Sequence, residues 1–282
     1  MKKFLGVIAL VLAAAVLGAC VSYGHDNVGI RSGEFFTERL DGGDRGMRIT
    51  SYVGSSPDVH IPSYIRGRPV RVIGDGAFGG RFGDLGEEGR IAEIVAEVFG
   101  GVPIGRNFDG SSIYRTVLTS VTIPDSVAVI GQNAFSRNQL TAIAIPENVI
   151  RINRGAFAWN PITAVTIPDN VYRIGSYAFW SNLLTAITIP DNVFYIGRGA
   201  FGNNPLVSIT FSDNIHTVHQ DVFSGSLRTV SQISIGANVN LHYDGDYRDV
   251  IWDAFREAYA ENGHRAGIFT RNEAGGWDWQ PR

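Results

Sequence analysis

The chain has 282 residues, of which 44% are hydrophobic, enough to build the core of one or two domains. Its formal net charge is −3. Residues 1–19 carry two lysines and no acid, so the remainder sets 22 arginines against 27 carboxylates, a net charge of −5. This dispersed acidic balance argues against a nucleic-acid partner.

Residues 1–19 have the pattern of an export signal peptide. Lys2 and Lys3 precede an uninterrupted apolar and glycine run, which is shorter than the roughly 20 residues of a transmembrane helix. The run ends in Leu-Gly-Ala before Cys20, and this sequence resembles the lipobox of bacterial lipoproteins. The resemblance implies lipidation of Cys20, which anchors a mature chain on a membrane. Because Cys20 is the only cysteine, its lipidation would leave no thiol for a disulfide, a cysteine nucleophile or a thiolate metal site.

Residues 79–117 lack the regular pattern found on both sides of them. Glycines crowd residues 79–89, and apolar residues then recur at positions i, i+3, i+4 and i+7, which favours a short amphipathic helix on a loop. The alternative is a decayed repeat whose strand covers residues 91–95. An excursion of this kind from a regular scaffold is a place where binding residues are often carried. The expected helix face consists of Ile91, Ile94, Val95 and Val98.

From residue 118 onward the sequence repeats with a period of 22 residues. Each unit contains one phenylalanine in register, and each of the first four contains one isoleucine followed by proline. Such a period indicates a solenoid, because one unit cannot bury its own apolar face and must stack on its neighbours. The units begin at Leu118, Leu140, Ile162, Leu184 and, more loosely, Leu206; the phenylalanines are Phe135, Phe157, Phe179, Phe201 and Phe223.

The residues of one unit predict a strand, a proline that ends the strand, and a set of side chains that point into the core. Leu118, Val121 and Ile123 fit an L-x-x-V-x-I strand, and Pro124 ends it because proline has no amide donor. An asparagine closes each unit, where its short amide can bond to the backbone of the neighbouring coil. The further inward positions are Val127, Ile130, Ala134 and Phe135, and the closing asparagines are Asn138, Asn160, Asn182 and Asn204.

The run I-P-D-x-V-x-x-I-G-x-x-A-F over residues 118–223 resembles the leucine-rich repeats of the BspA-like class, found in surface proteins of oral bacteroidetes and in spirochaete lipoproteins. The resemblance implies a β-rich leucine-rich-repeat solenoid with parallel strands on one face. Residues 49–52, 59–62 and 72–78 resemble the family's degenerate first unit. We therefore expect a tether and the start of an N-terminal cap over residues 20–48, and the solenoid over residues 49–240. The departures from the pattern are Asn153 and His219 for the turn glycine and Val222 for the alanine.

Residues 241–282 change character and predict a small α+β cap. Trp252, Phe255 and Tyr259 lie on one face of a helix expected from Asp249 to Asn262, and two strands are expected at residues 266–271 and 277–279. A solenoid needs a cover for its open apolar end. We therefore interpret Trp277 and Trp279 as core residues of the cap rather than as a ligand site.

No motif in the chain predicts catalysis or a cofactor. His216, His219 and Asp221 could be drawn as a metal cluster, but the two histidines occupy ordinary repeat positions and no further ligand is implied by spacing. Residues 244–246 lack the further acids of a calcium loop. Nucleophile-elbow, phosphate-loop and zinc-protease motifs are absent from the sequence. We expect a protein that is not an enzyme; the alternative is an enzyme with its site in the excursion at residues 79–117.

The variable positions of the repeat supply candidate partner-binding residues. They are tyrosine, tryptophan and arginine, the residue types that dominate binding hot spots. The alternative interpretation is padding between coils, which is favoured for Phe194. The candidates are Arg151, Trp159, Tyr172, Arg173, Trp180 and Tyr195.

Together these features predict a lipid-anchored protein of the cell surface, exported to the outer membrane, that binds a macromolecular partner through its solenoid. The family resemblance implies a protein partner, such as host matrix proteins or other bacterial surfaces. The alternative is a periplasmic scaffolding lipoprotein that binds components of the cell envelope.

Overall fold

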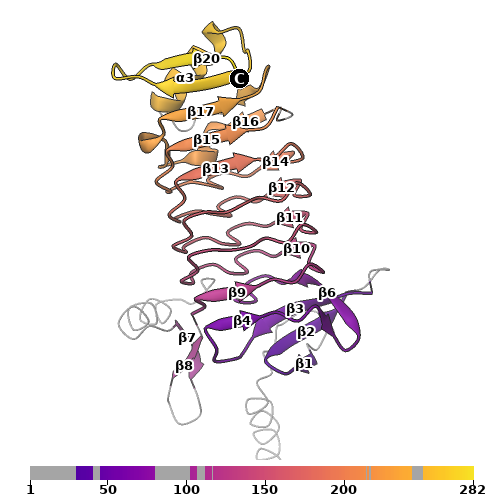
Figure 1. The fold of residues 1–282 in the computed structure, drawn as a ribbon. Helices are drawn as coiled ribbons and strands as arrows, with labels where there is room; N and C mark the ends of the chain where they lie inside the picture. The colour runs from indigo at the N-terminus through magenta and orange to yellow at the C-terminus, as the bar shows by residue number, and fades with distance from the viewer. Residues whose placement is uncertain are drawn as a thin grey trace, which may run out of the picture.

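The computed structural model describes residues 30–40, 45–79, 102–106, 112–115, 117–213, 215, 217–242 and 250–282. These residues form an upright column that rises from an N-terminal sheet to a C-terminal cap (Figure 1). Cys20, the helix expected at residues 91–98, and His216 lie outside the described residues. No helix in the described parts is long and apolar enough to span a bilayer.

The N-terminal sheet continues directly into the solenoid. Strands β1, β2 and β3 are antiparallel neighbours, and β3 then pairs in parallel with β6. Strand β6 also pairs antiparallel with β5 and in parallel with the first strand of the repeat ladder. The N-terminal end of the column is therefore covered by strands that continue its own sheet. Their bounds are β1 (Ile30–Ser32), β2 (Phe35–Arg39), β3 (Met47–Tyr52), β4 (Asp58–His60), β5 (Tyr64–Ile65) and β6 (Arg68–Ile73).

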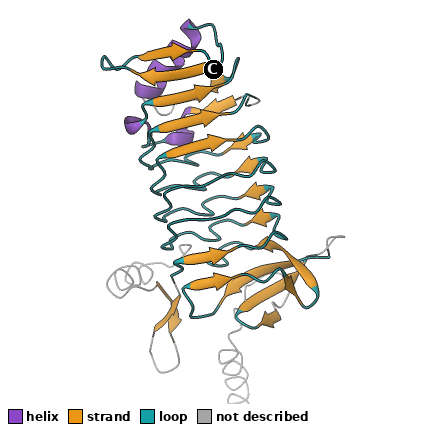
Figure 2. Ribbon diagram, viewed as in Figure 1, coloured by secondary structure: helices purple, strands orange, loops and turns teal. Residues whose placement is uncertain are grey.

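The repeat units stack through two parallel ladders, which lie on different sides of each coil (Figure 2). The first ladder, which we call the inner-isoleucine ladder, pairs the short strands β10, β11, β12 and β14 with a shift of 22 residues at each step. This confirms the period and the parallel stacking predicted from the sequence. The strands are β10 (Val129–Ile130), β11 (Arg151–Ile152), β12 (Arg173–Ile174) and β14 (Tyr195–Ile196).

The second ladder contains the predicted isoleucine-proline strands and is interrupted in the middle of the column. It is regular in β13, β15 and β17, whereas the units from Leu140 and Ile162 are joined there by one isolated bridge, Ala142 to Ala164. The strand expected from Leu118 to Ile123 is reduced to β9, which pairs with β4. The strands are β9 (Ser120–Thr122), β13 (Ala186–Ile189), β15 (Ser208–Phe211) and β17 (Gln232–Ile235).

The core is a continuous stack of phenylalanine rings. Successive ring centroids lie between 5.1 and 6.1 Å apart, and neighbouring planes are tilted by no more than 20°. Each ring is nearly or completely buried, and offset stacking of this kind adds to the stabilisation from burial. The predicted inward phenylalanines are thereby confirmed, and Phe78 joins them across the excursion. The stack runs through Phe78, Phe135, Phe157, Phe179, Phe201 and Phe223.

A second internal row is formed by the closing asparagines, which are all buried. Asn160 shows the pattern: its Oδ1 accepts from the N–H of Leu140 at 3.1 Å, while its Nδ2 donates to the carbonyls of Phe135 at 3.0 Å and Phe157 at 3.1 Å. Each asparagine therefore ties its own coil to the preceding one, as expected from the sequence. In the last coil Ser226 stands at the position of the asparagine, and its Oγ donates to the carbonyl of Phe201 in the preceding coil at 3.0 Å.

The C-terminal end of the column is closed by helix α3 (Val250–Glu261) and the hairpin of β19 (Gly267–Arg271) and β20 (Trp277–Gln280). Strand β19 pairs antiparallel with β17 and so extends the second ladder. The ring of Trp252 lies 6.2 Å from that of Phe223, and the expected helix face of Trp252, Phe255 and Tyr259 is buried. The aromatic stack therefore continues into the cap, whose strands agree with the expected positions.

The remaining elements are short. The predicted excursion contains a hairpin that the sequence did not indicate, formed by β7 and β8. After the last complete unit, β16 and β18 pair in parallel, and two 3₁₀ turns lead into β17. The bounds are β7 (Val102–Arg106), β8 (Ser112–Arg115), β16 (Thr217–His219), η1 (Gln220–Phe223), η2 (Leu227–Thr229) and β18 (Asn240–His242).

Candidate partner-binding surface

The outer side of the inner-isoleucine ladder carries two columns of exposed side chains. In each short strand the isoleucine points inward, so the residue before it points outward, as alternation in a strand requires. The residue two positions before the isoleucine is also exposed, because the next inward-pointing side chain is the valine that precedes it. We call the two columns together the ladder-face patch. Its apolar column is Ile150, Tyr172 and Phe194, and its arginine column is Arg151, Arg173 and Tyr195.

The apolar column is held by the backbone of neighbouring coils. The N–H of Ile150 donates to the carbonyl of Ala128 at 2.9 Å, that of Tyr172 to Ile150 at 3.1 Å, and that of Phe194 to Tyr172 at 3.0 Å. The exposed fractions rise along the column, from 37% at Ile150 and 41% at Tyr172 to 88% at Phe194. The padding interpretation of Phe194 is therefore wrong for the described coils, because most of its side chain stays exposed; the residue at the same position of the next coil, His216, lies outside the described residues.

The arginine column contains an ordered cation. The guanidinium of Arg173 lies 4.6 Å from the ring centre of Tyr195 in the next coil. Such stacking uses the face of the guanidinium and leaves its N–H groups, which lie in the plane, available to acceptors. Arg151 is the register partner of Arg173 one coil below and is also exposed. The structure therefore brings four of the six candidate residues together: Arg151, Tyr172, Arg173 and Tyr195.

The two candidate tryptophans lie elsewhere, on the turns that follow the inward phenylalanines. Trp159 is 50% exposed and packs under the guanidinium of Arg137, 5.4 Å from its ring centre. Trp180 is half-buried, and a Cβ added to Gly202 of the next coil would overlap its ring. Trp180 therefore fills the space that the glycine leaves and pads the contact between two coils.

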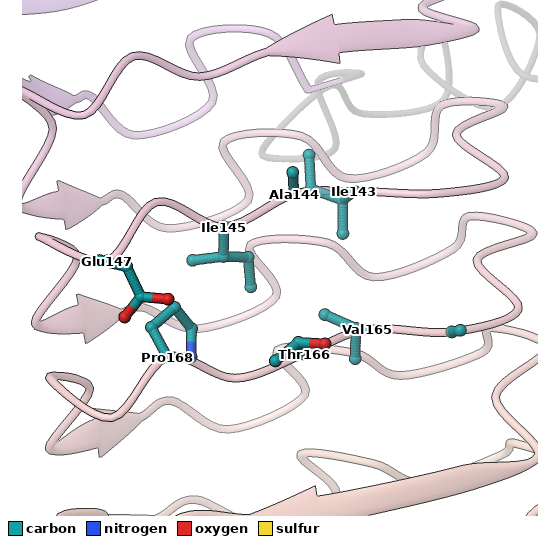
Figure 3. Close-up of a pocket in the computed structure, with 8 residues that line it drawn as sticks. Ile143, Ala144, Ile145, Glu147, Val165, Thr166 and Pro168 are labelled. Atoms are coloured by element: carbon teal, nitrogen blue, oxygen red, sulfur yellow. The ribbon is translucent and has the colours of Figure 1, made fainter.

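A pocket of about 310 Å³ opens on the other side of the coils, where the second ladder is interrupted (Figure 3). Its walls are the unpaired strand segments of two successive units, and most of the side chains that line it are small or aliphatic. Glu147 is the one ionisable side chain among the lining residues. The pocket therefore offers shape but little polar chemistry. It is lined by Ile143, Ala144, Ile145, Glu147, Ala164, Val165, Thr166 and Pro168.

The histidine motif is described only in part, because His216 and the side chain of His219 lie outside the described residues. No group of three or more histidine, cysteine, aspartate or glutamate side chains gathers among the described residues as a potential metal site. Asp221 is largely buried, and its Oδ2 lies 3.3 Å from Nε of Arg198, so this carboxylate is already paired within the solenoid.

Comparison with known proteins agrees with this geometry. Residues 107–229 match six copies of the BspA type leucine rich repeat region. No curated protein matches the chain significantly. The leucine rich repeat protein of T. pallidum superposes with a TM-score of 0.57 at 24% identity, covering 81% of this chain and 95% of that protein. At this identity the match shows the fold, a leucine-rich-repeat solenoid.

Two further solved structures are similar at lower scores. A leucine-rich repeat protein from Bacteroides ovatus has 18% identity and a TM-score of 0.49, covering 74% of this chain and 54% of its own length. A leucine rich cell surface protein from Faecalibacterium prausnitzii has 20% identity and a TM-score of 0.47, covering 90% of this chain and 61% of its own length. The chain thus spans between half and two thirds of these two larger proteins.

Proposed function

We propose that this leucine-rich-repeat solenoid is a lipid-anchored, non-catalytic binding module of the cell surface, which holds a protein partner through its outer side chains. The observation that carries the proposal is the ladder-face patch. Phe194 is 88% exposed, its N–H donates to the carbonyl of Tyr172 in the preceding coil, and it directly precedes Tyr195, over whose ring the guanidinium of Arg173 lies.

Physical chemistry supports a binding role for this surface. An exposed phenylalanine gains roughly 1.5–3 kcal/mol when a partner buries it. Tyrosine and arginine are enriched among the residues that dominate binding energy. Because the parallel ladder already fixes the backbone, association does not have to order a loop, and less conformational entropy is lost. We propose Trp159, and the part of Trp180 that its packing on Gly202 leaves exposed, as further partner-binding residues on the turn side.

The proposed location rests on the N-terminal sequence. Cys20 follows a signal-like segment, and its lipidation would place the solenoid at the outer membrane. A module exposed there can meet host matrix proteins or other bacterial surfaces. Protease treatment of intact cells tests the location, because the surface form is digested, whereas a periplasmic scaffolding lipoprotein survives until the outer membrane is opened.

The binding role is tested by capture with the soluble chain from Val21 to Arg282. Two double variants are compared with the wild type: Arg173→Gln with Phe194→Ser in the patch, and Trp159→Ala with Trp180→Ala on the turns. We expect captured proteins that are lost with the patch variant and reduced with the turn variant. If every captured protein is retained by both folded variants, the proposed binding surface is wrong.

A further inference from the structure

The arginine column contains a pair of like charges that no acid among the described residues neutralises in an ion pair. Arg151 and Arg173 are register partners in adjacent parallel strands and are both exposed. Among the described residues the ion pairs join other arginines to acids: Arg48 to Glu38, Arg198 to Asp221, Arg256 to Asp253, and Arg282 to Asp213. Like charges placed opposite one another in a sheet destabilise it. A bound anion would remove this repulsion.

The guanidinium of Arg173 is held where it can receive that anion. It lies 4.6 Å from the centre of the Tyr195 ring, and this contact with an aromatic face does not use up its N–H donors. A carboxylate is the matching group on a protein, because its two oxygens accept two parallel N–H bonds from one guanidinium. A lysine ammonium would act as a flexible point charge and could not form this pair of parallel bonds. The chain has no lysine after Lys3.

The apolar column determines what else the partner must carry. Ile150, Tyr172 and Phe194 are all more than one third exposed. The first two directly precede Arg151 and Arg173, and Phe194 directly precedes Tyr195 in the next coil. A polyanion without apolar groups, such as a sulfated polysaccharide, would neutralise the arginines but leave Phe194 in water. A polypeptide with both carboxylates and apolar side chains satisfies both columns.

The repeat also carries exposed acids, which lie outside the ladder-face patch. Each of the first four units has one directly after its proline, three residues before the apolar column; Asp169, for example, precedes Tyr172. Glu147 lines the pocket on the other side of the coils. The charges of the patch itself are therefore the two arginines. The exposed acids are Asp125, Glu147, Asp169 and Asp191.

We infer that the ladder-face patch recognises an acidic polypeptide segment that carries apolar side chains next to its carboxylates, with the carboxylates against Arg151 and Arg173 and an apolar side chain against Phe194. This inference rests on the proposed function and specifies the chemistry of its partner.

The test uses a library of random peptides displayed on phage, selected against the immobilised soluble chain. We expect the enriched peptides to combine aspartate or glutamate with apolar residues. Their binding should fall at least about tenfold with Arg151→Gln and Arg173→Gln together, and likewise with Phe194→Ser. A matched control variant, Arg228→Gln with Val207→Ser, changes an exposed arginine and an exposed aliphatic residue outside the patch and should bind like the wild type.

Several outcomes would overturn the inference. They are no enrichment, enriched peptides without an excess of acids, and enriched peptides that bind the patch variants as well as the wild type. Heparin and polyglutamate serve as charge-only probes. If they bind the patch as tightly as the selected peptides do, the site is a general polyanion site and the apolar column has no role. If a natural protein is captured independently of the patch, the proposed function survives while this inference fails.

Discussion

The side-chain amide of Asn160 donates a 3.0 Å hydrogen bond to the carbonyl oxygen of Phe135, 25 residues earlier in the chain. The same relationship recurs between Asn182 and Phe157 and between Asn204 and Phe179, at 3.0 and 2.9 Å. One short amide per unit thus satisfies backbone groups that stacking would otherwise bury without partners.

Replacing Asn160 by alanine should therefore destabilise the protein by about 3 kcal/mol, because it leaves a buried N–H and two buried carbonyls without that partner. Urea unfolding measures the change. Asn148→Ala is the matched control: this exposed amide makes one hydrogen bond, to the carbonyl of Asp125, and its loss should cost about 0.5–1.5 kcal/mol. Equal losses for the two variants would show that the internal row does not stabilise the stack.

Phe157→Ala should destabilise the column by about 3–5 kcal/mol, the usual range for removing a fully buried aromatic side chain. The ring of Phe157 lies 5.4 Å from both Phe135 and Phe179, so the substitution opens a cavity in the middle of the stack. Thermal unfolding measures this change. Tyr64→Ala, at a residue that is 65% exposed, is the control and should change the free energy of unfolding by less than about 0.5 kcal/mol. A Phe157 variant that is as stable as this control would contradict the stacked core.

Gly202→Ala should be destabilising because its new Cβ would overlap the Trp180 ring and meet the carbonyl oxygen of Ser224 at 2.7 Å. Overpacking of this kind costs about 1–3 kcal/mol. With Trp180→Ala already in place, the same substitution should cost less, with a coupling of at least about 0.5 kcal/mol in a double-mutant cycle. Zero coupling would mean that Trp180 does not pack on the next coil.

Ionisation of Tyr259 in the C-terminal cap should lower the free energy of unfolding at alkaline pH. Burial raises the pKa of Tyr259, whose hydroxyl donates to the carbonyl of Gly236 at 2.7 Å and accepts from the N–H of Val239 at 3.0 Å. The stability that the neutral Tyr259 hydroxyl contributes is fully present below about pH 10, where this tyrosine is neutral in both the folded and the unfolded state. Above about pH 10 the unfolded tyrosine ionises first, so stability is lost as pH rises toward the folded pKa.

Tyr259→Phe should therefore be about 1–3 kcal/mol less stable at neutral pH, because the Val239 N–H loses its acceptor. It should also lose less stability than the wild type between pH 9 and 11. Chemical denaturation across this range measures both effects. Tyr52 remains in both proteins, and burial and then the charge of Glu34 raise its pKa as well, so a residual alkaline loss is expected. Identical pH slopes would exclude Tyr259 as a source.

The sequence predicted the solenoid well because the repeat can be seen in the spacing of residues along the chain. The 22-residue spacing of Phe135, Phe157 and Phe179 identifies inward positions without knowledge of the strands. The inner-isoleucine ladder was not predicted, since two-residue strands such as Arg151–Ile152 are too short to show an alternation. It is defined by pairing between coils, which a single unit does not reveal.

The candidate surface was predicted only in part for a related reason. Whether a variable residue is exposed depends on the residue one coil away. Trp180 is half-buried because the next coil offers Gly202, whereas Phe194 is largely exposed among the described residues, which do not include His216 at the same position of the next coil. A signal was available in the column of Ile150, Tyr172 and Phe194, whose members share one repeat position and are all large and apolar.

The most direct test of the account is the affinity of the soluble chain for a captured protein partner, measured by titration calorimetry. The wild type is compared with a folded variant that combines Arg151→Gln, Arg173→Gln and Phe194→Ser. We predict that the Kd rises at least about 100-fold, as expected when several hot-spot residues are removed at once. A Kd that stays within about twofold of the wild-type value would show that the partner is held elsewhere, because a twofold change is smaller than the effect of losing one ordinary interface contact.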